Sequence, residues 1–174
     1  MTTTLVLGVG NTLLRDEGAG IQVIQYLQRH SLLPPDVTCL DGGTLSFTLL
    51  APIATATQLI VVDAAELAAQ PGTVRTFVDT AMDAFLGSRG RSGHAVGLKD
   101  LLDILRLTGS LPHRRALVGI QPQVLDCGDR LSQAVAGAIP QAAQRVLDLI
   151  HGWRQPGSSK GRQLVYPRDN VASH

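Results

Sequence analysis

Short apolar runs alternate with longer stretches of helical periodicity along most of the chain. The apolar runs predict strands at 5–7, 37–40, 59–62 and 116–120, and helical spacing follows at 21–27, 98–105 and 132–153. Strands that alternate with helices are typical of a three-layer α/β fold, in which helices cover both faces of a mostly parallel sheet. The segment Thr73–Val78 alternates polar and apolar residues after a short connection, so we expect it to be an antiparallel edge strand.

Two connecting segments are less regular. The mostly apolar segment Thr44–Ile53 predicts a short helix that ends near Pro52. The segment Leu86–Gly97 contains glycine, serine and arginine in place of an apolar pattern, and His94 lies near its end. We therefore expect a mobile loop before the helix that begins near Leu98.

The first predicted strand ends in a glycine loop that presents two acids. The stretch from Leu5 to Gly20 reads LVLGVGNTLLRDEGAG, and Asp16 and Glu17 stand just ahead of the first helical run. Either acid can serve as a helix cap. The loop does not match a dinucleotide site, because Leu13 occupies the position of the third glycine, and it lacks the lysine of a P-loop. We therefore expect no nucleotide cofactor.

Three residues compete as functional candidates: Glu17, Asp63 and His94. Asp63 directly follows the most strand-like run of the chain. Taken singly, they can be a helix cap, a turn acid and a surface histidine. The carboxyl ends of parallel strands share one edge of a sheet, however, and ligands bind at that edge. Two carboxylates and one imidazole there would form a three-ligand site for a divalent metal, with positions open for water or substrate.

Composition and charge narrow the class of protein. The chain has 174 residues, which is the length of a single domain. Its net charge of +1 gives no excess positive potential that would attract nucleic acid. It shows no signal peptide or membrane-spanning stretch, and Cys39 and Cys127 lack disulfide or zinc spacing. We expect a cytoplasmic monomer without a membrane or nucleic-acid partner, with one domain at 1–154 and a disordered tail at 155–174.

Four motifs, read in order, resemble those of the hydrogenase maturation endopeptidases. They are GVGNTLLRDEGAG, DGGT at Asp41–Thr44, LIVVD ending at Asp63, and SGHAVGL from Ser92 to Leu98. The resemblance runs from about Leu5 to about Ile150. The family consists of cytoplasmic proteases that trim the carboxyl terminus of the large subunit of nickel-iron hydrogenases, so the resemblance implies that substrate.

The resemblance also implies a fold and a set of site residues. The expected fold is a twisted, mostly parallel five-stranded sheet flanked by helices. Glu17, Asp63 and His94 fall at the family's nickel-ligand positions. Asp41, Gly42, Gly43 and Thr44 would belong to recognition of the precursor, although a simple glycine turn also explains DGGT.

Among hydrolytic mechanisms, attack by water is the one that the sequence leaves open. The chain has no HExxH motif and no GxSxG nucleophile elbow. In the expected mechanism a divalent ion polarises the scissile carbonyl, and Glu17 or Asp63 accepts the proton of the water. In the family, nickel already installed in the precursor is the mark that the protease reads, so the metal arrives with the substrate. The alternative is a maturation chaperone that binds the metal or the precursor without cutting it.

Overall fold

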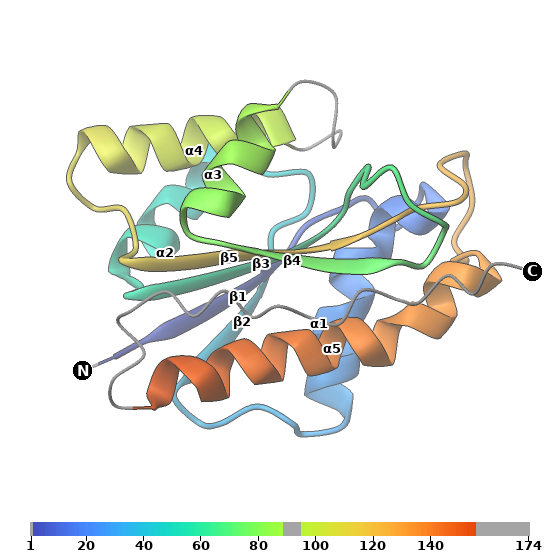
Figure 1. Ribbon diagram of the computed structural model, residues 1–174, viewed down its shortest axis with the longest axis horizontal. Helices are drawn as coiled ribbons and strands as arrows, with labels where there is room; N and C mark the ends of the chain where they lie inside the picture. The colour runs from blue at the N-terminus through green and yellow to red at the C-terminus, as the bar shows by residue number, and fades with distance from the viewer. Residues whose placement is uncertain (1, 89–94, 156–174) are drawn as a thin grey trace, which may run out of the picture.

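The computed structural model describes residues 2–88 and 95–155. Its centre is a five-stranded sheet with the strand order β2-β1-β3-β5-β4 (Figure 1). The strands are β1 (Thr4–Gly8), β2 (Val37–Asp41), β3 (Gln58–Ala64), β4 (Val74–Val78) and β5 (Arg114–Ile120). All pairs are parallel except β4 with β5, which is antiparallel. The predicted sheet and its antiparallel edge strand are both confirmed.

Helices cover the two faces of the sheet, as expected for a three-layer fold (Figure 1). On one face lie α1 (Ala19–Arg29) and α5 (Gln133–Arg154), and on the other α2 (Leu50–Thr55), α3 (Thr80–Gly87) and α4 (Ala95–Leu107). Along β3, Ile60 and Val62 pack toward α1 and α5, whereas Leu59 and Val61 pack toward the opposite layer. Each face of the central strand therefore has its own apolar core.

Two connecting segments differ from expectation. Helix α3 was not predicted, and its last two residues, Leu86 and Gly87, fall in the expected loop. The helix expected at Thr44–Ile53 is replaced by a 3₁₀ turn, η2 (Phe47–Leu49), followed by α2. Pro52 does not end that helix, because it falls in the first turn, where a missing N–H leaves no hydrogen bond unmade. The expected tail lies, apart from Gln155, outside the described residues.

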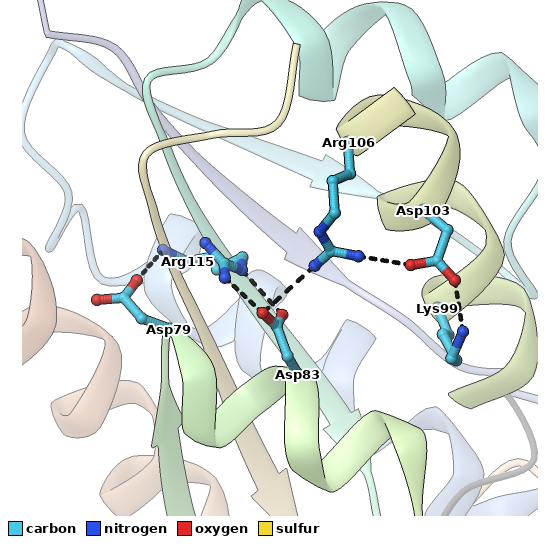
Figure 2. A network of polar contacts seen from close by, with 6 residues as sticks. All are labelled: Asp79, Asp83, Lys99, Asp103, Arg106 and Arg115. Atoms are coloured by element: carbon cyan, nitrogen blue, oxygen red, sulfur yellow. Dashed lines mark hydrogen bonds and ion pairs between the residues drawn. The ribbon is translucent and has the colours of Figure 1, made fainter. Parts of the chain in front are cut away.

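A network of charged side chains joins α3, α4 and β5 (Figure 2). The Asp83 carboxylate of α3 accepts two hydrogen bonds from Arg115 of β5, at 2.9 and 2.5 Å, and one from Arg106 of α4 at 3.3 Å. Arg106 also donates to Asp103 at 2.6 Å, and Asp103 pairs with Lys99. The pKa of Asp83 lies below its usual value, chiefly because Arg115 donates to its carboxylate. The network thus fastens α4, the helix that follows His94, to the sheet.

This network predicts a loss of stability in acid. Because the folded-state pKa of Asp83 is lowered, its contribution is complete above the unfolded pKa of about 4 and disappears as the pH falls through the folded value. Asp83→Asn should lower the free energy of unfolding by about 2 kcal/mol at pH 7, and by much less at pH 3. Urea titrations at both pH values measure this difference.

The control for this prediction is Asp148→Asn, since Asp148 is an exposed carboxylate of α5 that accepts a hydrogen bond from Gln144. It should change the stability little at either pH. An effect of Asp83→Asn that is as large at pH 3 as at pH 7 would show that the charge of Asp83 is not responsible.

Candidate active site

The site lies where the chain reverses its direction of winding across the sheet. From β1 the chain passes to β2 on one side, and from β2 it crosses to β3 on the other side of β1. In open α/β sheets such a switch point leaves a crevice at the carboxyl ends of the strands, where ligands bind. Glu17 follows β1, and Asp63 is the penultimate residue of β3. The segments that carry both expected carboxylates therefore lie at this switch point.

Two glycines bring the loop that carries Glu17 against the end of β3. A Cβ atom at Gly10 would lie 1.9 Å from the carbonyl oxygen of Glu17, so the two backbone segments touch. A Cβ atom at Gly20 would lie 2.1 Å from the carbonyl oxygen of Val62 and 2.4 Å from that of Val9. Val62 directly precedes Asp63, whose side chain is buried, whereas Glu17 remains partly exposed. The glycines thus fix the close approach of the two acidic segments.

Asp16 does not have the role of a helix cap. No side chain caps α1 or the 3₁₀ turn η1 (Arg15–Gly18). Instead the fully buried carboxylate of Asp16 accepts hydrogen bonds from the backbone N–H groups of Gln123, Val124 and Ser132, at 2.9, 2.9 and 2.6 Å, and from the Ser132 hydroxyl at 2.7 Å. It therefore anchors the β5–α5 connection and the start of α5 to the loop of Glu17.

The hydrogen bonds of Asp16 determine its protonation state. Burial alone would raise the pKa of Asp16, but the hydrogen bonds from Ser132, Val124 and Gln123 outweigh burial and hold the pKa below its usual value. The Asp16 side chain is therefore an ionised carboxylate, although it is buried, because hydrogen bonds stabilise its negative charge. Adjacent acids consequently have different environments: Asp16 points into the protein, while Glu17 is left partly accessible.

Asp16→Asn should therefore destabilise the fold, contrary to the mild effect expected of a capping acid. The amide nitrogen cannot accept a hydrogen bond, so buried N–H groups of the connection lose their partner, at a cost of about 2–3 kcal/mol. Asp126→Asn is the matched control, because Asp126 lies in the same connection with its side chain 74% exposed. Thermal unfolding of both variants tests this, and equal melting temperatures would show that Asp16 is not an anchor.

The DGGT loop lies directly beside the glycine loop. The N–H of Gly42 donates to the carbonyl of Gly8 at 2.8 Å, and the N–H of Gly10 donates to the carbonyl of Gly43 at 2.8 Å. The Asp41 carboxylate accepts the N–H of Gly43 at 2.8 Å, which closes a tight turn. Gly43 has a φ of +50° and open space around its Cα, and Thr44 is exposed. DGGT therefore forms the expected glycine turn, which lies beside the loop that carries Glu17.

His94, the third expected ligand, lies outside the described residues. The helix α4 begins at the next residue, and a Cβ atom on Gly97 in its first turn would lie 3.6 Å from Cδ1 of Leu45, just after DGGT. The start of α4 is therefore at the same edge of the sheet as the two acids. Within the described ranges, no three His, Cys, Asp or Glu side chains are grouped as a metal site.

Gln121 was not identified from the sequence, yet it supports the segment after Asp63. Its buried side chain accepts the N–H of Leu67 at 2.7 Å and donates to Glu66 at 3.1 Å. The only signal for Gln121 in the sequence was its position directly after β5.

Burial raises the pKa of the Cys39 thiol to about 11, which disfavours the thiolate and agrees with the absence of a cysteine nucleophile in the expected mechanism.

Fold and site together define an α/β protein with carboxylates at the switch point of its sheet, an arrangement suited to metal-assisted hydrolysis. A family model described as hydrogenase maturation protease matches residues 21–149. The hydrogenase expression/formation protein HupD of Rhodobacter capsulatus is 39% identical over 167 residues, which are 94% of this chain and 80% of HupD.

Two solved structures agree with this match. The hydrogenase maturating endopeptidase HybD from E. coli superposes with a TM-score of 0.81 at 35% identity, covering 88% of this chain and 94% of HybD. The [NiFe] hydrogenase maturation protease HybD from Thermococcus kodakarensis has a TM-score of 0.74 at 26% identity, covering 85% and 99%. The chain belongs to the hydrogenase maturation protease family. Of the helices in the described ranges, none has the length and apolar character needed to cross a membrane.

Proposed function

We propose that the protein removes the carboxyl-terminal extension from the large-subunit precursor of a nickel-iron hydrogenase after nickel insertion, acting as a cytoplasmic monomer. One observation carries the proposal: in a chain of this family, the partly exposed Glu17 and the buried Asp63 lie in segments that meet at the switch point of the sheet. The proposed metal ligands are Glu17, Asp63 and His94, and their two carboxylates and one imidazole are a donor set that nickel accepts. No nucleotide takes part.

The residues of the chain have distinct proposed roles in cleavage. Nickel presented by the precursor supplies the polarising charge for the scissile carbonyl. Glu17 or Asp63 accepts the proton of the attacking water and passes it to the leaving amine. The closely packed glycines hold the segments of Glu17 and Asp63 in place, so these two acids need little reorganisation before the reaction.

The DGGT residues Asp41, Gly42, Gly43 and Thr44 have a proposed role in substrate recognition. Their turn is hydrogen-bonded to the glycine loop, and Gly43 leaves the space around its backbone open. An extended peptide can approach such a backbone without meeting a side chain. Recognition at this position would place the cleaved segment beside the two acids.

The function is tested by incubating the protein with nickel-loaded and with nickel-free precursor and measuring the mass of the precursor before and after. The proposal predicts loss of the extension from the nickel-loaded form alone. Binding of the loaded precursor without any change in mass would favour a maturation chaperone over a protease. Cleavage of both forms would contradict the role of nickel as the mark that is read.

A further inference from the structure

Three exposed apolar side chains lie in loops at the edge of the sheet that carries the site. Leu13, Phe47 and Leu125 are 70%, 72% and 54% exposed, and they lie in the segments that follow β1, β2 and β5. The other large exposed apolar residues of the described ranges are Leu32, after α1, and Leu107, at the end of α4. Both of these helices run back toward the opposite edge of the sheet (Figure 1). Leu13, Phe47 and Leu125 together form what we call the apolar rim.

Hydrogen bonds hold the backbone of Leu13 and the segment of Leu125 in place. The N–H of Leu13 donates to the Asn11 side chain at 3.0 Å, and its carbonyl accepts the N–H of Gly128 at 2.9 Å. Val124, the neighbour of Leu125, is bonded to Asp16 through both its N–H and its carbonyl, at 2.9 and 3.1 Å. Because these two loops are held in place, their exposed leucines can meet a partner with little ordering of the backbone.

The rim borders the site on two sides. Leu13 and Glu17 belong to the same loop, which is bonded to the Leu125 segment through Gly128 and to the DGGT turn through Gly43. Phe47 follows that turn in η2. A macromolecule that brings a peptide bond to Glu17 and Asp63 must therefore lie against the loops that carry these apolar side chains.

We propose that the apolar rim is the docking surface for the folded body of the hydrogenase precursor, which would present an apolar patch beside its carboxyl-terminal extension. This inference rests on the proposed function. A second copy of the chain is the weaker candidate, because a self-contact over the rim would cover the edge of the sheet that the extension must reach. Docking here would give affinity for the whole precursor that does not depend on the cleaved segment.

The test uses the double variant Leu13→Ser/Leu125→Ser, with Leu107→Ser as the matched control. Leu107 is 88% exposed and far from the site, so the control removes an exposed leucine without touching the rim. Titration calorimetry measures the Kd for nickel-loaded precursor, and initial rates give KM and kcat. The double variant should bind at least about tenfold more weakly, with a raised KM and a kcat within roughly twofold of wild type. Phe47→Ser should act in the same direction.

The possible outcomes separate the rim from the proposed function. Unchanged affinity of the double variant, or an equal loss in Leu107→Ser, would overturn docking at the rim even if wild type cleaves the precursor. If the wild-type protein binds the precursor through the rim but does not cleave it, docking at the rim stands and the proposed protease activity is contradicted. Self-association that the double variant abolishes, without any change in precursor binding, would assign the rim to a second copy. Thermal unfolding of each variant checks that all are folded.

Discussion

Asp63→Asn should reduce processing of the nickel-loaded precursor at least about a hundredfold, because the amide can neither accept the proton of the water nor serve well as a ligand. The substitution keeps the shape of the buried side chain, so the free energy of unfolding should change by about 1 kcal/mol or less. Glu17→Gln and His94→Ala should cause comparable losses. Mass spectrometry of the precursor over time measures the rate.

The control for these variants is Asp100→Asn, since Asp100 is an exposed carboxylate on α4, the helix that follows His94. Its processing rate should match that of wild type. Full processing by His94→Ala would remove the histidine from the mechanism. Loss of folding in Asp63→Asn would instead assign this acid to the core, and Glu17→Gln, at a partly exposed position, would then carry the test.

Gly20→Ala should unfold or severely destabilise the protein. The new methyl group would lie 2.1 and 2.4 Å from the carbonyl oxygens of Val62 and Val9, and these are backbone atoms of the sheet edge that cannot rotate away. Overpacking of this kind costs about 3 kcal/mol or more. The separation of α1 from β3 would also move Glu17 away from Asp63, so any folded fraction should process the precursor slowly. Thermal unfolding and the processing rate are the measurements.

Gly137→Ala provides the contrast, because Gly137 also lies within a helix but has open space around its Cα. It should stabilise the protein by about 0.5–1 kcal/mol, since alanine loses less backbone freedom on folding. If Gly20→Ala behaved like Gly137→Ala, the close approach of α1 to the end of β3 would be wrong.

The sheet could be predicted because its strands are short apolar runs separated by helical periods. Asp63 was identifiable for the same reason, since it directly follows the apolar run that forms β3. The edge position of β4 could be predicted because polar and apolar residues alternate along it and because only a short connection joins it to β3. These features are local in sequence, and burial on one or both faces of a sheet leaves a clear pattern.

Other features depend on partners that are distant in sequence. Asp16 and Glu17 look alike in the chain, yet Asp16 bonds Ser132, 116 residues away. No local pattern distinguishes a capping acid from such an anchor.

The helix α3 is short, but its buried residues Met82, Phe85 and Leu86 have helical spacing, so a signal for it was present in the sequence. The arrangement of His94 with the two acids stays a prediction.

The most direct test of the central claim is a crystal of the protein soaked with a divalent ion. The account predicts that side-chain atoms of Glu17, Asp63 and His94 all reach one ion at about 2.0–2.2 Å, the range for oxygen and nitrogen ligands of such metals. Zinc or cadmium can stand in for nickel in this experiment, because the position of the three ligands is what is measured. An ion bound elsewhere, or the three side chains pointing to separate places, would contradict the claim.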